Sequence, residues 1–420
     1  MSRPAERRAG GGLLRAIGPG LLLAATGVGA GDLATASIVG SLLGVAVLWA
    51  VVVGALLKFV VTEGLARWQL ATGDSLLEGA VRHLGPIVVW AFLPYLLLWS
   101  FFVATALMGA CGVTLHAILP LFDRAETGKL VFGVVSSLLG LGLVWRGGYR
   151  LFERVMKVCI GVMFLTVLVT AVLLWPGTAV VLEGLLVPRV PAVEGALPWV
   201  LALMGGVGGT VTVLCYGYWL REEGRTRSED LKLCRIDLAA GYLMTAVFGV
   251  AMVMIGSGTA IEGRGAGLLV TLSTRLSTEL GPVGGWMFLL GAFGAVFSSL
   301  LGVWQAVPYL FADCWRLRRG IAAVESTLPV DTRSAAYRRY LALLAILPIV
   351  GLFYSFREMQ KLYALTGLAF FPLLAAALLL FNGRARWIGR THRNGPIATA
   401  GLVAVLALFL WLAVANVGDG

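Results

Sequence analysis

Charged side chains are scarce in this chain of 420 residues, because Asp, Glu, Lys and Arg together make up only 13% of it. Hydrophobic residues make up 59%, and the mean hydropathy is +0.90. So few charges do not cover the surface of a water-soluble protein of this size. In a bilayer every backbone polar group needs a partner within the protein, and long apolar segments find one by forming helices. The composition therefore predicts an all-α polytopic membrane protein.

Cysteine and histidine are scarce as well, with five and three residues. No two cysteines form a C-x-x-C pair, and His83, His116 and His392 are too far apart to make a local metal motif. The pattern therefore excludes a disulfide framework and a local zinc motif. The sequence also has no nucleophile–base motif, phosphate-binding loop or hydrolase motif. We expect neither an enzyme nor a resident cofactor.

Basic residues outnumber acidic ones by 33 to 22, which gives a formal charge of +11. Such an excess can indicate a nucleic-acid partner. Here, however, most Lys and Arg residues fall in segments on the same side of the expected membrane as the amino terminus. Short cytosolic loops are rich in Lys and Arg, so we expect a cytosolic amino terminus. The basic residues then face membrane lipids, and no nucleic-acid partner is expected.

Eleven apolar runs are long enough to cross a bilayer, which takes about 20 residues per helix. They lie near residues 14–38, 41–66, 87–110, 129–145, 155–175, 197–219, 236–257, 283–311, 340–355, 360–381 and 396–415. An odd number of crossings puts the carboxyl terminus outside. The compact loops and short tails favour a prokaryotic plasma membrane. The sequence leaves the oligomeric state open, and a monomer is compatible with it.

Two of these runs share a proline that is followed eight positions later by GVG. They read PGLLLAATGVGAG from Pro19 and PWVLALMGGVGGT from Pro198. Small residues also let membrane helices pack closely, but matched glycine clusters in two halves are typical of a transporter's midplane site. We therefore predict a five-plus-five inverted repeat in which helices 1 and 6 are discontinuous. Its parts are a cytosolic tail at 1–12, a first repeat at 13–178, a second repeat at 195–382 and an eleventh helix at 395–416.

An interrupted membrane helix exposes backbone carbonyl oxygens, which are suitable ligands for hard cations. We expect the interruptions near Thr26–Gly31 and Gly205–Thr212. Asp32 follows the first of them and is the only acid between Glu6 and Glu63. A carboxylate at membrane depth indicates a functional site, but an Asp at the start of a helix also caps free amide groups. Both roles stay open for Asp32.

Other polar residues within the runs are fewer and less distinctive. Ser298 and Gln305 in the eighth run are candidates to line a cavity, although buried hydroxyls and amides more often join neighbouring helices. Glu63 and Arg67 are one helical turn apart, so we expect an ion pair between them. Asp237 follows a basic residue at the start of a run, and we interpret it as a structural acid.

Several segments, in their order and spacing, carry a resemblance to a known family. They are IGPGLLLAATGVGAGDLATA in the first run, then LARWQLATGDSLLEGAVR, YRLFERVM, GLLVPRVP and CRIDLAAGYL. Together they resemble the natural-resistance-associated macrophage protein family of divalent-metal transporters, whose first crossing begins GPG and carries D-P-G-N. The resemblance implies a LeuT-like fold with eleven helices, in agreement with the repeat. It also implies a secondary transporter or facilitator that works by alternating access.

The chain departs from the family pattern at the metal site. Aligned on GPG, Gly29 takes the position of the metal-binding Asp, and Asp32 takes that of the Asn. The family's sixth crossing reads A-T-V-M-P-H, and here Thr212 replaces the Met and Leu214 replaces the His. A glutamine of the tenth crossing aligns with Phe370. Loss of the thioether removes a ligand that favours softer transition metals.

The donors that remain favour a hard divalent cation such as Mg²⁺ or Mn²⁺. Asp32 and Thr212 are the candidate metal ligands, and backbone oxygens near the two glycine clusters complete the site. The full set of candidate ion-binding residues is Asp32, Gly29, Thr26, Gly209, Thr212, Gln305 and Ser298. No cofactor is expected besides the transported cation itself.

Proton coupling by the usual family route is not expected, because the family's third-crossing acids align with Ala106 and Gly109. Two other functions stay open. One is transport of a small organic solute, such as an amino acid or amine, since LeuT-type folds accept many substrates. The other is a membrane sensor that no longer transports, since the family's usual ligands are missing.

Overall fold

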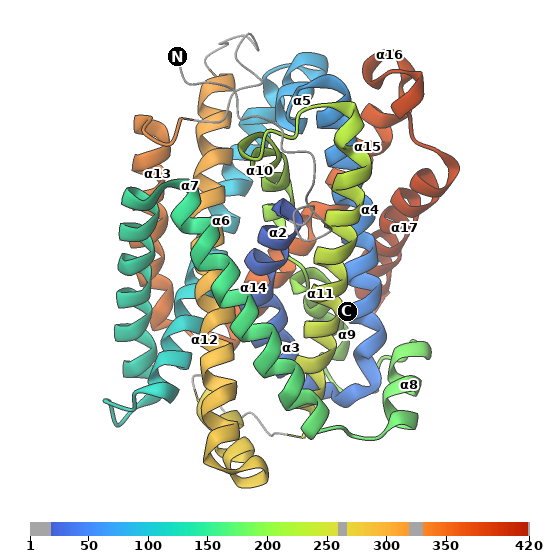
Figure 1. Cartoon of the computed structure of the whole chain (residues 1–420). Coiled ribbons are helices and arrows are strands. Elements are labelled where there is room, and N and C mark those ends of the chain that lie inside the picture. The colour runs from blue at the N-terminus through green and yellow to red at the C-terminus, as the bar shows by residue number, and fades with distance from the viewer. Residues whose placement is uncertain (1–17, 259–266, 319–330, 419–420) are drawn as a thin grey trace, which may run out of the picture.

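A computed structural model describes residues 18–258, 267–318 and 331–418 of the chain. Within these ranges the secondary structure is helical and contains no strand. Most helices run roughly along one long axis (Figure 1). The expected cytosolic tail at 1–12 lies outside the described residues. The all-α prediction is therefore confirmed for the part of the chain that the structure covers.

Nine helical segments among the described residues are long and apolar enough to cross a membrane. One of them, 32–72, joins the last seven residues of the first predicted run to the whole of the second. The last predicted run lies in α17 (Pro396–Gly418), of which Pro396–Phe409 forms a shorter apolar stretch. The count of eleven crossings therefore stays a prediction, and multi-pass insertion is supported by the nine segments.

The first predicted run is interrupted by a widened turn instead of an extended break. It consists of α2 (Pro19–Gly27), a π-helical stretch (Val28–Thr35) and α3 (Ala36–Leu43). Proline is tolerated at the start of α2 because the first amides of a helix have no partner within it. Short π-helical turns inside helices occur frequently at functional sites. Asp32 lies inside this wider turn.

The sixth predicted run does lose its helical geometry. Helix α9 (Ala196–Gly206) is followed by Gly208 and Gly209, with φ of +72° and +85°. Only glycine adopts these angles without steric cost. The chain then continues as a 3₁₀ turn (Val211–Cys215) and α10 (Tyr216–Glu222).

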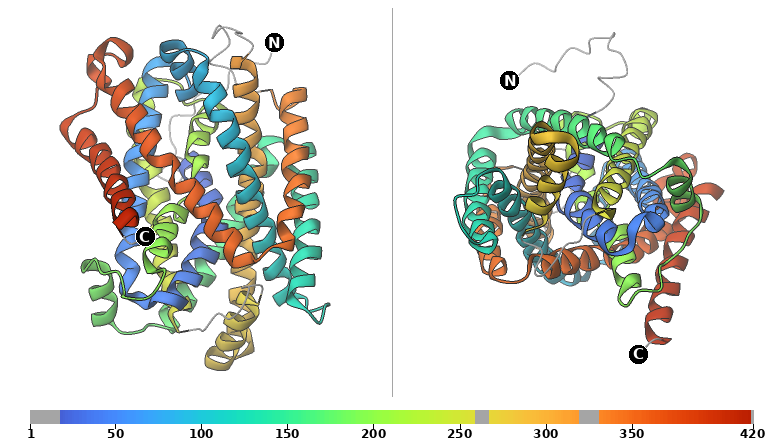
Figure 2. Two further views of the ribbon diagram at one scale, coloured as in Figure 1. Left: turned by 180° about the vertical axis from the view of Figure 1, so that it is seen from behind. Right: turned by 90° about the horizontal axis from the view of Figure 1, so that it is seen from below.

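The other helices enclose these two runs. Viewed along the long axis, α2 and α3 are surrounded by helices while α17 lies at the edge (Figure 2). The enclosing helices are α4 (Leu48–Thr72), α5 (Leu76–Leu84), α6 (Ile87–Ile118), α7 (Ala125–Leu173), α8 (Thr178–Leu186), α11 (Leu231–Ser257), α12 (Leu268–Arg318, kinked at Gly281), α13 (Ala335–Ile346), α14 (Phe356–Leu368), α15 (Phe370–Gly383) and α16 (Ala385–Ile388).

The two glycine clusters meet at the centre of the molecule. A Cβ atom added to Gly27 would overlap the backbone of Gly208 and Gly209. Backbone therefore packs directly on backbone at this crossing, which small residues make possible. The segments that share the GVG pattern in the sequence are neighbours in space.

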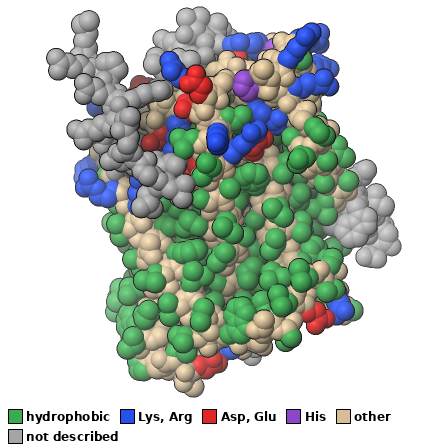
Figure 3. Space-filling view, turned by 45° about the vertical axis from the view of Figure 1, so that its right-hand side comes forward, with side chains coloured by type: hydrophobic (Ala, Val, Ile, Leu, Met, Phe, Trp, Pro, Cys, Tyr) green, Lys and Arg blue, Asp and Glu red, His purple; other side chains and the backbone are tan. Residues whose placement is uncertain are grey.

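Charged residues gather at one end of the molecule, above a belt of hydrophobic side chains (Figure 3). At this end α5 carries Glu78, which is buried and accepts a hydrogen bond of 2.8 Å from Arg221. Arg316 bridges Glu78 and Asp313, 2.7 Å from the latter. Buried charges are stable only when they are paired in this way. The network ties α5, α10 and α12 together.

The sequence also predicted an ion pair between Glu63 and Arg67 and a structural role for Asp237. Glu63 and Arg67 form an ion pair of 3.3 Å, as expected, and Arg235 also binds Glu63. Asp237 accepts hydrogen bonds from the amides of Gly18 and Gly20, so it caps α2 from a neighbouring helix. Both predictions are confirmed.

Substituting Gly27→Ala tests the backbone contact. The added methyl group would overlap Gly208 and Gly209, so we expect a loss of about 1–3 kcal/mol in the free energy of unfolding. The measurement is denaturant unfolding in detergent, followed by tryptophan fluorescence. Gly142→Ala is the matched control, since a Cβ there meets nothing within 4 Å. Equal stability of the two variants would contradict the close crossing.

Substituting Glu78→Gln tests the charged network. Burial raises the pKa of Glu78, but Arg221, the Ser75 amide and Arg316 together outweigh it, so the pKa lies below its ordinary value of 4.5. The carboxylate therefore stabilises the fold fully above pH 4.5 and loses this effect as the pH falls through the lowered pKa. At pH 7 we expect the Glu78→Gln variant to have a free energy of unfolding about 3 kcal/mol or more below that of wild type.

Unfolding titrations from pH 7 to pH 3 measure this dependence. The difference in the free energy of unfolding between wild type and Glu78→Gln should become smaller toward pH 3. Glu153→Gln removes a partly exposed partner of Lys157 and serves as the control, with a change of about 0.5 kcal/mol or less. A difference that stays constant with pH would rule out the charge as its cause.

Candidate functional site

Asp32 stands where the two interrupted runs meet. Its side chain is fully buried, and Oδ2 accepts a hydrogen bond of 3.1 Å from the amide of Gly208. Oδ1 is buried without a hydrogen-bond partner. The cap that the sequence suggested for Asp32 thus takes another form, because the carboxylate binds an amide of the sixth run instead of amides that follow it in the chain. The other carboxylate oxygen, Oδ1, remains available to a ligand.

Thr212 lies on the other side of the same glycine pair. Its side chain is buried, and Oγ1 has no hydrogen-bond partner. This oxygen is 2.7 Å from the point that a Cβ on Gly209 would occupy. Asp32 Oδ2 is bonded to Gly208 and Thr212 adjoins Gly209, so the two residues that each carry an unpartnered oxygen lie against two consecutive glycines. Unsatisfied polar atoms are costly in a buried region, and in native proteins they often mark a site for a water or an ion.

The wall beside Thr212 is polar and aromatic. Thr210 accepts a hydrogen bond of 2.9 Å from the indole of Trp99 in α6. Tyr363 in α14 is buried beside Thr210. The 3₁₀ turn after the break is thereby held against the third and tenth predicted crossings.

Lys58 is a functional candidate that our reading of the sequence missed. It lies in the middle of α4 and is buried, and its Nζ donates hydrogen bonds to the carbonyls of Gly205, at 2.8 Å, and Val207. Its charge also acts on Asp32. A signal was available, since Lys58 is a basic residue in the interior of a predicted crossing, where charged residues indicate function.

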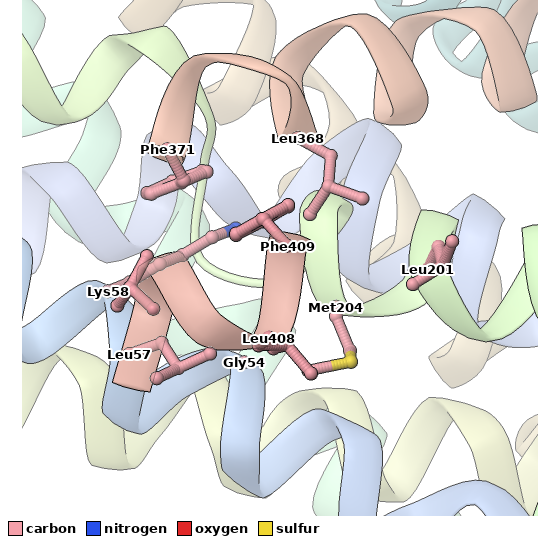
Figure 4. A pocket seen from close by; sticks show the side chains of 10 residues that line it. Gly54, Leu57, Lys58, Leu201, Met204, Leu368, Phe371, Leu408 and Phe409 are labelled. Atoms are coloured by element: carbon pink, nitrogen blue, oxygen red, sulfur yellow. The ribbon is translucent and has the colours of Figure 1, made fainter. Parts of the chain in front are cut away.

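The stem of Lys58 borders a small cavity between α4, α9, α15 and α17 (Figure 4). Its volume is about 10 Å³, which is room for no more than about one water molecule. Its other walls are mostly apolar, including Met204, Phe371 and Phe409. The Phe371 ring centre is 5.1 Å from Nζ, a distance at which an ammonium is attracted to an aromatic face.

Thr26 and Gly29 do not join the Asp32 group. The Thr26 hydroxyl donates to the carbonyl of Leu22, and the Thr26 carbonyl accepts a hydrogen bond from Ser299. A Cβ on Gly29 would overlap Ser299, so this glycine packs on α12. The position that carries the family's metal-binding Asp in our alignment is therefore occupied by a helix contact. Ser299, not Ser298, is the serine of α12 that reaches the first run.

The side chains of Ser298 and Gln305 form their hydrogen bonds away from Asp32 and Thr212. The Ser298 hydroxyl donates to Ala295 in its own helix. Gln305 accepts a hydrogen bond of 2.8 Å from Trp219 and donates one of 2.8 Å to Tyr309. Both side chains have structural partners, which removes them from the group of available ligands. Of the seven candidate residues, the structure brings together Asp32, Gly209 and Thr212.

The donors around Gly208 and Gly209 are all oxygen atoms: one carboxylate oxygen, one hydroxyl and backbone carbonyls. Within residues 18–258, 267–318 and 331–418 no three His, Cys, Asp or Glu side chains form a metal-binding group. Oxygen ligands of this kind suit hard cations that keep part of their hydration shell. Such a group of oxygen atoms is able to bind a cation.

Comparison with known proteins agrees with this architecture. A protein of Pasteurella multocida without an assigned function is 24% identical over 299 residues, covering 69% of this chain and 67% of its own. The divalent metal cation transporter MntH of Mycobacterium tuberculosis is 27% identical over 293 residues, covering 68% of this chain and 66% of its own length. That relative is therefore matched over slightly less than two thirds of its length.

Solved structures share the fold at low sequence identity. The Eremococcus coleocola manganese transporter, in complex with an aromatic bis-isothiourea substituted compound, superimposes with a TM-score of 0.73 at 16% identity, over 98% of this chain and 89% of that one. MhsT in complex with L-phenylalanine gives 0.58 at 17% identity, over 92% and 97%. The model of the family described as natural resistance-associated macrophage protein-like matches residues 20–419, and the chain belongs to this family.

Proposed function

We propose that this protein carries a hard divalent cation, such as Mg²⁺ or Mn²⁺, across the membrane by alternating access. Membership of the family and the relatives described as divalent metal cation transporters support the cation class. The nine apolar helical segments support a role within a membrane, which we take to be a prokaryotic plasma membrane with the amino terminus in the cytosol.

One observation carries this proposal. Asp32 and Thr212 each carry a buried oxygen without a hydrogen-bond partner, and both residues lie against the non-helical backbone at Gly208 and Gly209. Interrupted helices at the midplane supply cation ligands in transporters of this architecture. Asp32 provides the negative charge and Thr212 a neutral oxygen. The carbonyls released at the end of α9 complete the ligand set.

The composition of the site favours a hard cation over a soft one. No thioether or imidazole adjoins Gly208–Gly209 among the contacts described above, and carboxylate, hydroxyl and carbonyl oxygens prefer Mg²⁺, Ca²⁺ and Mn²⁺. The cavity of about 10 Å³ beside Lys58 is too small for an amino acid or amine, whereas an apolar cavity of about 360 Å³ bordered by Leu214 and Phe370 is large enough for either. A substrate panel that includes amino acids and amines distinguishes the two classes.

Proton coupling by the usual family route is not part of the proposal. Ala106 and Gly109 stand at the positions that align with the family's acids. The Ala106 carbonyl accepts a hydrogen bond of 3.0 Å from Gln360, and a Cβ on Gly109 would lie 3.0 Å from the Phe356 ring. A closely packed segment without a carboxylate lacks the groups that relay protons in transporters.

The first test is Mn²⁺ and Mg²⁺ flux into proteoliposomes. We expect saturable flux in wild type and a loss of at least about tenfold in Asp32→Asn, because the amide keeps an acceptor for Gly208 but carries no charge. Thr212→Val should weaken transport by a smaller factor. Ser298→Ala is the matched control and should leave flux unchanged, since its hydroxyl bonds only within its own helix. Folded wild type without divalent-cation flux would refute the proposal.

The second test imposes a pH gradient on the same proteoliposomes. Because the third-crossing acids are replaced by Ala106 and Gly109, we expect an inward proton gradient to change the initial cation flux by less than about twofold. The measurement pairs the flux assay with a pH-sensitive dye inside the vesicles. Acidification of the lumen in proportion to cation uptake would show coupling and contradict this expectation.

A further inference from the structure

Lys58 occupies an unusual position for a basic residue. Its ammonium is buried at the break of the sixth run and bonded to two backbone carbonyls, those of Gly205 and Val207. Both carbonyls lie where α9 ends, and helix geometry leaves the last carbonyls of a helix without partners inside it. The only charged group that the structure describes acting on this ammonium is Asp32. The Lys58 ammonium thus interacts with backbone carbonyls and a carboxylate, which are the ligands that a bound metal cation needs.

The charge of Lys58 affects any second cation at this site. With the ammonium in place, Asp32 and Lys58 together carry no net charge. A divalent ion beside Asp32 would then be repelled by the ammonium, and this repulsion is strong where water is excluded. In addition, the Gly205 and Val207 carbonyls already accept hydrogen bonds from Lys58 and are not available to the ion. Binding of such an ion and the observed position of Lys58 are therefore in competition.

The Lys58 side chain is flexible enough to leave the carbonyls. Lysine has a flexible stem of four methylene groups, and here the stem borders the cavity shown in Figure 4. The Phe371 ring, whose centre is 5.1 Å from Nζ, attracts the ammonium in addition to the two carbonyls. Rotation about the bonds of the flexible stem would free both carbonyls without unwinding α4.

We propose that the Lys58 ammonium is a tethered cation that occupies the carbonyl ligands of the transport site, and that a substrate cation has to displace it. This inference rests on the proposed cation transport and adds a specificity-determining residue to it. Lys58 lowers the affinity of the site for every divalent cation. Its removal should strengthen binding even though it deletes two hydrogen bonds.

The test is Mn²⁺ binding to purified protein, measured by isothermal titration calorimetry in detergent with no other divalent ion present. Lys58→Met keeps the length of the side chain and removes the charge, and we expect Mn²⁺ to bind at least about tenfold tighter than in wild type. The double variant Lys58→Met with Asp32→Asn should lose this gain, which assigns it to the site. A lysine with only a structural role would give no gain in affinity.

Lys129→Met is the matched control. Lys129 is also buried and donates to a backbone carbonyl, that of Tyr354, at 2.9 Å, but it pairs with Glu126 near the start of α7. Its removal should leave Mn²⁺ affinity unchanged. Lys58→Gln is a second variant in case Lys58→Met does not fold, because the amide still donates to a carbonyl. It should also bind Mn²⁺ more tightly than wild type.

The possible outcomes separate this inference from the proposed function. Wild type that binds Mn²⁺, with neither Lys58 variant binding it more tightly, would overturn the tethered cation and leave cation transport standing. Binding by a Lys58 variant alone would support the tethered cation, and the flux assay on wild type would then decide the proposed transport. No Mn²⁺ binding by any folded variant would overturn both.

Discussion

The break after Gly206 depends on two buried ionisable side chains that bind its backbone. Lys58 donates to the carbonyls of Gly205 and Val207, while Asp32 accepts from the amide of Gly208. A peptide segment that leaves helical geometry inside a membrane protein must have its polar groups satisfied within the protein. Here two side chains from other segments do so. The non-helical geometry of this segment is therefore coupled to the charges beside it.

This coupling explains why glycine is required on both sides of the crossing. Gly208 and Gly209 adopt angles that other residues avoid, and Gly27 leaves space for them to pack directly on the first run. A side chain at Gly27 would overlap this backbone, and one at Gly208 or Gly209 would strain it. Packing and charge thus act on the same few residues, and the site is formed by the fold of two short segments instead of by a cluster of ligand side chains.

Part of this arrangement could be predicted from the sequence. The shared GVG pattern identified the two segments that meet, and Asp32 was recognisable as an isolated acid at membrane depth. The partners were not predictable in the same way. Whether Ser298 or Ser299 reaches the first run depends on the rotation of α12, because consecutive helical residues point about 100° apart. Nothing local in the sequence shows which carbonyls Lys58 meets, since that contact joins segments 147 residues apart. The π-helical turn around Asp32 also has no distinct sequence signal.

The central claim is that the meeting point of the two glycine clusters is a cation site. Crystals grown with Mn²⁺ and measured near the manganese absorption edge test it most directly, because anomalous scattering locates the ion independently of the protein. The account predicts a peak beside Gly208 and Gly209, between Asp32 Oδ1 and Thr212 Oγ1. A manganese peak elsewhere in the membrane region, with none at this point, would contradict it.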